Sequence, residues 1–294
     1  MRYVFLLLAL SFAQLTWALN VVVTTASMGM LAREVGGAAV EVSVLAPPDR
    51  DPHALQAKPS MMRALRDADL VVAVGAELEA GWLPAALQGA ANPRILPGRL
   101  GYFEAAAQVP LLDAGQAADR ARGDVHPMGN PHVHLDPARM ARIAHALAER
   151  MGRLAPDQAG QFRAGAERFA RAVEARSPGW REKAAGAPGA VLYHKDGDYL
   201  LAFLGVPVMG YIEPLPGVPP TARHLESLIQ NLKGRRGVVL HHTYQPAQGP
   251  RRVAESLGWP VRVVPMEPAA DSRADGYFQL IEAWVAALAA GRDG

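Results

Sequence analysis

The stretch GNPHVHLDP, residues 129–137, places three side chains that can bind metals close together in the sequence. His132 and His134 are two residues apart, and Asp136 follows two residues later. They match the first part of an HxHxDH pattern, in which two zinc ions activate a hydroxide for hydrolysis. Position 137 holds proline, where that pattern has its last histidine. Because Asp136 and Pro137 are better explained as the N-cap and first residue of a helix, a zinc-dependent hydrolase is the alternative interpretation.

Three histidines lie at the ends of predicted strands or just before predicted helices. His53 follows the second strand, His132 precedes the helix that starts after Asp136, and His194 closes the strand at 189–194. Ligands of an open α/β sheet bind beyond the carboxyl ends of its strands, so these imidazoles can converge although 79 and 62 residues separate them. Three imidazole nitrogens and one oxygen suit a tetrahedral divalent ion such as zinc.

The other chemical signals in the sequence are weaker. It contains no GxxxxGK[ST], no GxGxxG after a strand, no GxSxG and no HExxH, which argues against several enzyme classes. His126 either assists the metal site or lines its loop. His241 and His242 end a predicted strand, so one of them can point toward the cleft, but neither is assigned as a ligand.

Strand and helix patterns alternate along the chain and predict an α/β fold with mostly parallel sheets. Apolar runs of strand length occur at 19–25, 40–47, 69–75, 189–194, 206–211, 236–242 and 260–266. Apolar residues at helical spacing occur at 59–68, 136–151, 157–176, 196–204, 221–232, 247–257 and 274–290. Pro178 is expected to bend or end the helix at 157–176.

These patterns predict two lobes, each with a sheet flanked by helices, joined by one long linker helix. We assign residues 1–18 to a signal peptide, 19–153 to the N-terminal lobe, 154–186 to the linker helix and 187–294 to the C-terminal lobe. The signal, MRYVFLLLALSFAQLTWA, combines Arg2 with a short apolar run and small residues before the expected cleavage site.

Composition points to a free periplasmic protein. The apolar run of the signal is shorter than the roughly 20 residues that cross a bilayer, and we expect no membrane insertion after cleavage. A formal net charge of +2 provides no basic field for nucleic acid. The sequence has no cysteine, which excludes disulfides, cysteine-ligated zinc and a lipid-modified N-terminal cysteine.

Three longer motifs follow one another along the chain. They are DPHALQAKPSMMRALRDADLVVAVGAELEAGWLP (51–84), NPHVHLDP (130–137) and YHKDGDYLLAFLGVPVMGYIEPLPGVPPTARHLESLI (193–229). They resemble, respectively, the DPH, P-S, ADL and E-x-W segment, the NPHxWLDP segment, and the H-x-x-x-x-Y, P-G and H-L segments of the zinc and manganese solute-binding proteins of ABC transporters. The resemblance covers essentially the whole mature chain, and the family has two α/β lobes joined by one long helix.

The resemblance implies that His53, His132 and His194 are metal ligands. The family's fourth ligand is a carboxylate just past the last strand, usually Asp. Glu267 is the nearest match, with Asp271 or a water as alternatives. His134 stands where the family often has Trp, so the resemblance does not make it a ligand.

By the same resemblance, we expect a monomeric, non-enzymatic binding protein that captures a divalent metal between its lobes. It would deliver the ion to a membrane permease with a cytoplasmic ATPase. Nitrogen donors favour Zn²⁺ as the transported ligand over Mn²⁺. The alternatives are the zinc-dependent hydrolase and a non-metal periplasmic binder or adhesin on the same scaffold.

Overall fold

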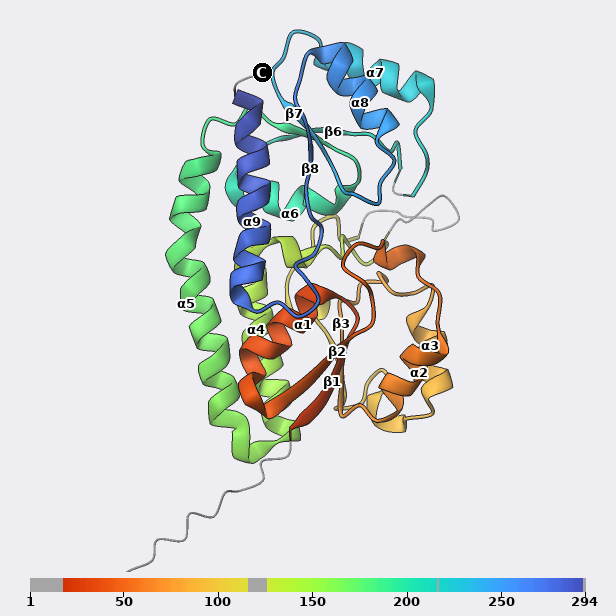
Figure 1. Cartoon of the computed structure of the whole chain (residues 1–294), viewed down its shortest axis with the longest axis vertical. Coiled ribbons are helices and arrows are strands. Elements are labelled where there is room, and N and C mark those ends of the chain that lie inside the picture. The colour runs from red at the N-terminus through yellow and green to blue at the C-terminus, as the bar shows by residue number, and fades with distance from the viewer. Residues whose placement is uncertain (1–17, 116–125, 216, 293–294) are drawn as a thin grey trace, which may run out of the picture.

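The first half of the chain forms a four-stranded parallel sheet with the order β2-β1-β3-β4 (Figure 1). The structure, a computed structural model, describes residues 18–115, 126–215 and 217–292, so the predicted signal at 1–18 lies outside the described residues apart from Ala18. The strands are β1 (Leu19–Val23), β2 (Val40–Val44), β3 (Leu70–Ala73) and β4 (Tyr102–Glu104). All of β3 is buried, as expected of a central parallel strand covered on both faces.

Alternate residues of β1 and β3 pack against helices on opposite faces of this sheet. Val21, Val23 and Val72 contact the helices α1 (Ala26–Gly36) and α4 (Pro137–Leu154) on one side. Val22 and Val71 contact the helices α2 (Pro59–Arg66) and α3 (Leu83–Ala90) on the other side. The sheet is therefore the middle layer of an α/β/α lobe, because successive strand side chains point to opposite faces.

The second half repeats this architecture with the strand order β6-β5-β7-β8, again all parallel. Its strands are β5 (Ala190–Leu192), β6 (Val208–Tyr211), β7 (Val238–His241) and β8 (Val261–Val263). Its helices are α6 (Asp198–Leu204), α7 (Ala222–Leu232), α8 (Gln248–Leu257) and α9 (Ala274–Ala289). Each of these eight elements falls within or close to a segment that the sequence predicts, and the α/β class with two sheets is confirmed.

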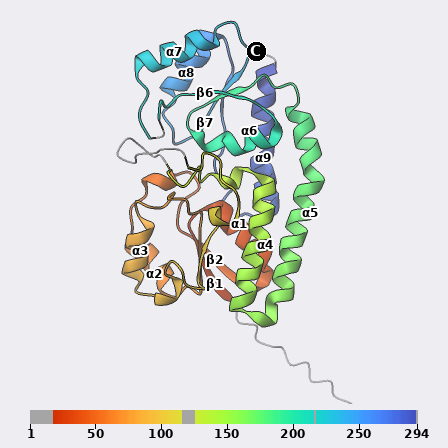
Figure 2. The ribbon, with the colours of Figure 1, turned by 180° about the vertical axis from the view of Figure 1, so that it is seen from behind.

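A long helix, α5 (Ala159–Ala184), lies alongside both lobes (Figures 1 and 2). Its 26 residues span about 39 Å at 1.5 Å per residue. Of the two effects expected of Pro178, a bend or an end of the helix, the end is wrong, because α5 continues to Ala184. Proline leaves the carbonyl of Glu174 without its helical partner, but both residues lie on the exposed face, where water can bond that carbonyl. Trp180 and Ala184 are buried beyond the proline, and their packing favours continuation of the helix.

The C-terminal segment also crosses between the lobes. After β8 the chain descends to the N-terminal lobe, where the backbone N–H of Ala274 donates to Glu34 of α1 at 3.1 Å and the guanidinium of Arg273 donates to the Arg33 carbonyl at 3.2 Å. Helix α9 then returns beside α5. The domain boundaries at 153 and 186 stay predictions, but α5 and the segment before α9 both connect the lobes.

Candidate metal centre

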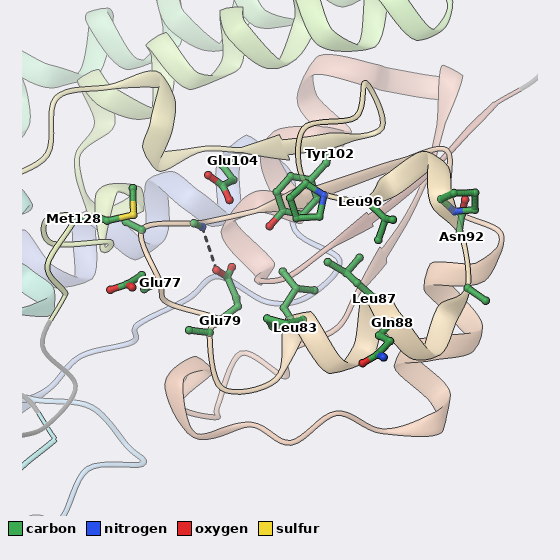
Figure 3. A pocket seen from close by; sticks show the side chains of 17 residues that line it. Glu77, Glu79, Leu83, Leu87, Gln88, Asn92, Leu96, Tyr102, Glu104 and Met128 are labelled. Atoms are coloured by element: carbon green, nitrogen blue, oxygen red, sulfur yellow. Dashed lines mark hydrogen bonds between the residues drawn. The ribbon is translucent and has the colours of Figure 1, made fainter. Parts of the chain in front are cut away.

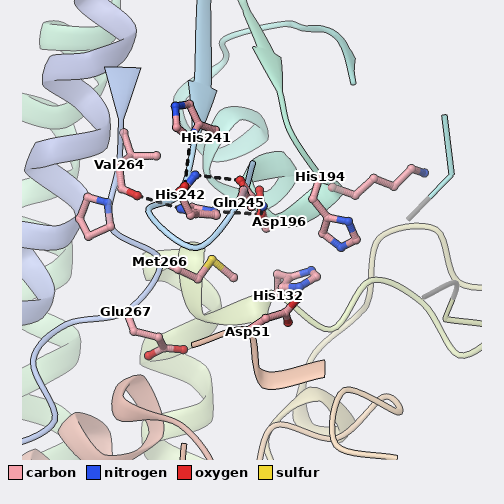
Figure 4. Close-up of polar contacts among 12 residues, drawn as sticks. Asp51, His132, His194, Asp196, His241, His242, Gln245, Val264, Met266 and Glu267 are labelled. Atoms are coloured by element: carbon pink, nitrogen blue, oxygen red, sulfur yellow. Dashed lines mark hydrogen bonds and ion pairs between the residues drawn. The ribbon is translucent and has the colours of Figure 1, made fainter. Parts of the chain in front are cut away.

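Three histidines from both lobes meet in the cleft between the two sheets. His53 lies in a short 3-10 turn after β2, His132 in the loop before α4, and His194 directly after β5. One ring nitrogen of each lies within 4.8 Å of the others. The rings of His132 and His194 lie nearly perpendicular to each other, with centroids 5.2 Å apart (Figure 4). The structure thus brings together the three histidines that the sequence predicts as a cluster.

Each of the three rings has its Nδ1 against an oxygen acceptor. Nδ1 of His53 lies 2.8 Å from Oδ1 of Asp51, and Nδ1 of His132 lies 2.8 Å from Oδ1 of Asn130. Nδ1 of His194 lies 2.9 Å from Oε2 of Glu213. With the proton on Nδ1, the lone pair of each neutral ring is on Nε2, the atom left to face the cleft. Acceptors of this kind fix the orientation of metal-binding histidines and increase their basicity.

The contacts of the Asn130 side chain show which of its amide atoms is the oxygen and which is the nitrogen. Its Oδ1 also accepts the backbone N–H of His132 at 3.0 Å, and its Nδ2 donates to the carbonyl of Lys195 at 2.7 Å. An amide turned the other way would lose both hydrogen bonds. Sequence analysis did not identify Asp51, Asn130 or Glu213. The first two had a signal, since both precede a histidine by two residues with proline between them, in DPH and NPH.

His132 is the most completely desolvated of the three. It is 2% exposed, and no described residue hydrogen-bonds its buried Nε2. Burial lowers the pKa of His132 well below its ordinary value, and the neighbouring histidines, His194 first, lower it further. The ring is therefore neutral at pH 7, and its lone pair points into a cleft that holds other imidazoles. A buried polar atom of this kind is explained by a ligand that it binds.

His194 differs from His132 in its electrostatic surroundings. Burial by itself lowers the pKa of His194, but the hydrogen bond to Glu213 and the charges of Asp196, Glu213 and Asp51 outweigh it and raise the pKa above the ordinary value. The same carboxylates attract a divalent cation bound at Nε2. The C-terminal lobe therefore supplies most of the negative charge next to the cluster.

His126 adds a fourth imidazole at the edge of the cluster. Its Nε2 lies 3.1 Å from Nε2 of His53, and its ring centroid lies 6.3 Å from that of His132. Two nitrogens bound to one tetrahedral zinc at about 2.0–2.1 Å lie about 3.3 Å apart, so this spacing suits two ligands of the same ion. The sequence left open whether His126 assists the site, and the structure places its ring beside that of His53.

Glu267 lies elsewhere, at the N-terminus of α1. The backbone N–H and the hydroxyl of Ser27 both donate to its Oε2 at 2.6 Å. Figure 4 shows Glu267 below Met266, apart from His132 and His194. Helix N-termini favour a carboxylate because their N–H groups and the helix dipole face it. The structure does not bring Glu267 into the histidine group, and its role as a ligand stays a prediction.

The remaining residues of the opening stretch also face away from the cluster. His134 places Nε2 3.1 Å from the carbonyl of Met266 and 3.8 Å from Glu267. Asp136 accepts the backbone N–H of Arg139 at 3.0 Å and pairs with its guanidinium, so it caps α4, with Pro137 in the first turn as predicted. The geometry therefore does not assemble the HxHxD side chains into one metal site.

Behind His194 lies a buried polar network of the C-terminal lobe. Nε2 of His242 contacts Asp196 at 2.9 Å, and Nδ1 of His242 faces the carbonyl of Val264 at 2.8 Å (Figure 4). Gln245 donates to Asp196 at 3.2 Å. Burial opposes the charge on His242, but Asp196 outweighs it and raises the pKa of His242. The network holds the turn that follows His194, and the side chain of His242 lies behind that histidine.

The three histidines line a cavity of about 730 Å³. Its other walls come from both lobes and include Arg50, Glu213 and Tyr244. In the described part of the chain, no helix combines the length and apolar character that a membrane span requires.

Comparison with known proteins identifies the family. The sequence matches the family described as zinc-uptake complex component A, periplasmic, over residues 21–291. The chain belongs to that family. A member of known name, the high-affinity zinc uptake system protein ZnuA of Yersinia pestis, is 27% identical over 239 residues, which cover 75% of this chain and 74% of the relative.

Solved structures share the fold of this chain. A ZnuA deletion mutant with zinc bound has a TM-score of 0.75 and 22% identity, covering 92% of this chain and 98% of that one. FpvC from Pseudomonas aeruginosa, in complex with Mn²⁺, has a TM-score of 0.76 and 22% identity, covering 94% of this chain and 98% of that one. As a member of the zinc-uptake component A family, the protein is a periplasmic metal-binding component of ABC import systems, and neither the hydrolase nor the non-metal binder is favoured.

Proposed function

We propose that this protein captures one Zn²⁺ ion in the cleft between its lobes, with Nε2 of His53, His132 and His194 as ligands. The observation that carries the proposal is the shared orientation of the three rings. Each Nδ1 is held by an oxygen acceptor, and Nε2 of His132 is buried with no hydrogen-bond partner among the described residues. Three imidazole nitrogens that lie within 4.8 Å of one another, on rings oriented in this way, suit a single ion.

For the fourth ligand we prefer His126 to Glu267. His126 already lies 3.1 Å from a ligand nitrogen of His53, whereas the Glu267 carboxylate is bonded to Ser27. Four imidazoles complete a tetrahedral shell and leave no position for a reacting water or substrate, so we propose that the site holds its ion and catalyses no reaction. Nitrogen donors favour Zn²⁺ over Mn²⁺, which prefers oxygen.

We also propose that the mature protein works as a periplasmic monomer and passes its ion to a membrane permease driven by a cytoplasmic ATPase. The family membership and the predicted export signal support this role. Because α5 and the segment before α9 both join the lobes, we expect release to involve loop rearrangement around the histidines more than a wide opening of the lobes.

Isothermal titration of zinc into chelator-treated protein tests the central proposal. We expect one tight site in the wild type and in His134→Ala, and a loss of affinity of more than about 100-fold in His132→Ala, since a lost ligand costs more than a lost orienting partner. His134→Ala is the matched control because it lies two residues away and faces Met266. If both variants lose binding equally, or if neither zinc nor manganese binds more tightly than about micromolar, the assignment is wrong.

A further inference from the structure

A second cavity, of about 710 Å³, opens on the N-terminal lobe between α3 and β4 (Figure 3). Leu83 and Leu87 of α3 form its floor, and Leu96 and Tyr102 form the facing wall. We call it the α3 groove. Its volume lies within the range of pockets that hold a ligand or several side chains of a partner.

The α3 groove collects exposed apolar side chains. Only five large hydrophobic side chains are exposed among the described residues, and two of them, Leu96 at 37% and Met128 at 61%, line this groove. Pro84, Pro93 and Pro97 also line it, and each fixes its own backbone angle φ. A wall fixed in this way loses little conformational entropy when a partner binds.

One end of the α3 groove is acidic. Glu77, Glu79 and Glu104 lie at this end, close to Met128 (Figure 3), and none of the described lining residues is Lys, Arg or His. Glu79 is buried, with hydrogen bonds from Thr24, Val74 and Gly75, and burial raises its pKa, so the acidic contact surface at this end comes from Glu77 and Glu104. An occupant that places a lysine or arginine at this end and apolar side chains along the floor complements the groove.

The α3 groove is connected to the metal centre by one turn. The backbone N–H of Gly129 donates to the carbonyl of His126 at 2.9 Å, which closes the turn His126–Pro127–Met128–Gly129. His126 lies at the histidine cluster and Met128 in the groove, so the two ends of this turn serve the two sites. Gly129 has φ +119°, and a Cβ there would meet Leu111 at 2.7 Å, so the turn is closely held against the lobe.

We infer that the α3 groove is a docking surface for a segment of the receiving permease that carries apolar side chains next to a lysine or arginine. The inference rests on the proposed function, since it needs a partner that takes the metal. Such a segment would contact Met128, and any displacement of Met128 moves His126 through the turn. Docking is thereby coupled to His126, the fourth proposed ligand, which favours release on arrival at the permease.

The test uses the permease and its ATPase reconstituted in lipid vesicles. ATP hydrolysis is measured against the concentration of zinc-loaded binding protein. We expect Leu96→Asp, and the double variant Glu77→Lys/Glu104→Lys, each to raise the concentration for half-maximal stimulation by about tenfold, the loss typical of a central contact residue. Leu100→Asp is the matched control for the first, because Leu100 is 36% exposed and lies outside the groove. Glu174→Lys/Glu182→Lys on the exposed face of α5 is the control for the second.

Zinc titration of the same variants separates this inference from the proposed function. We expect the zinc affinity of the groove variants to stay within about twofold of the wild type, whereas failure of the wild type to bind zinc would contradict the proposed function itself. A benzophenone side chain at Met128 should cross-link to the permease on illumination, and one at Val263, 55% exposed on β8, should not. Unchanged stimulation by both groove variants, or a cross-link from Met128 only to a second copy of this chain, would overturn the docking surface.

Discussion

The two lobes hold their histidines in different ways. In the N-terminal lobe, His53 and His132 each follow an oxygen-bearing residue by two positions, with a proline between, and that oxygen accepts both the backbone N–H and the ring Nδ1–H. In the C-terminal lobe, His194 is held by Glu213, which is 19 residues further on, beyond the end of β6. One arrangement is local, and the other needs two strands to be assembled.

This difference shows which part of the site depends on the rest of the fold. Asp51–Pro52–His53 and Asn130–Pro131–His132 can orient their rings within three residues, because proline fixes the backbone between acceptor and histidine. The ring of His194 points correctly only when β5 and β6 pair and bring Glu213 beside it. The lobe with the long-range partner should therefore be the more sensitive to losing it.

Among variants that keep all the histidines, the largest expected effect comes from removing the ring acceptors. Glu213→Ala should weaken zinc binding towards the upper end of the roughly 10–100-fold range expected for a partner that orients a metal ligand, and Asp51→Ala towards the lower end. The reason is that Pro52 still restricts the backbone before His53, whereas His194 loses its partner from β6. Competition with a chelator of known zinc affinity measures both. Glu213→Gln is the control, since its amide oxygen can still accept, and equal losses in the two alanine variants would remove the distinction between the lobes.

A smaller effect is expected from Asp198, at the start of α6 behind His194. Burial, with the charge of Asp196 and against the hydrogen bond from Tyr211, raises the pKa of Asp198 to about 7. The folded state therefore keeps a proton that the unfolded chain loses near pH 4, and the free energy of unfolding falls as pH rises from about 4 to 7. When pH rises from 5 to 8, the free energy of unfolding of Asp198→Asn should increase by about 1–2 kcal/mol relative to that of the wild type. This is less than the full value of about 1.36 kcal/mol per pH unit, because Asp198 is partly exposed to solvent screening.

Urea unfolding of the metal-free proteins at pH 5 and pH 8 measures this difference. Asparagine keeps an oxygen acceptor for the Tyr211 hydroxyl, so the comparison isolates the charge. A parallel pH dependence in the wild type and in Asp198→Asn would show that this buried carboxyl does not titrate near neutral pH.

The smallest effect is expected on the stability of the N-terminal lobe, from loss of the helix cap Asp136. Asp136→Ala removes the cap of α4 and should lower the free energy of unfolding by about 1 kcal/mol, while zinc affinity and the stoichiometry of one ion stay unchanged. Urea unfolding and calorimetry on the same preparation check both values. Loss of a zinc ion in this variant would instead make Asp136 a ligand and restore the hydrolase-type cluster.

The fold was largely readable because apolar periodicity determines which segments bury a face. Continuous apolar runs indicated central strands such as β3, which is buried throughout. The helical stripe of Met140, Ile143 and Leu147 indicated α4, and these three side chains are buried. The sequence patterns did not indicate α1, α3 or β4. Strand β4 lies in GYFEAAAQ, which has no apolar run of strand length such as those around β5 and β8, and its place at the sheet edge is decided by pairing with β3.

By itself, the sequence determined the three histidines that meet in the cleft, because each stands where a strand ends or a helix begins, and parallel strands end at one edge of a sheet. Only the tertiary structure decided what surrounds them. In the tertiary structure, Glu213 contacts Nδ1 of His194, and Nε2 of His126 lies 3.1 Å from Nε2 of His53. Glu267 accepts a hydrogen bond from Ser27, which is 240 residues away in the sequence. Such partners depend on how separate segments pack, and no local pattern carries that information.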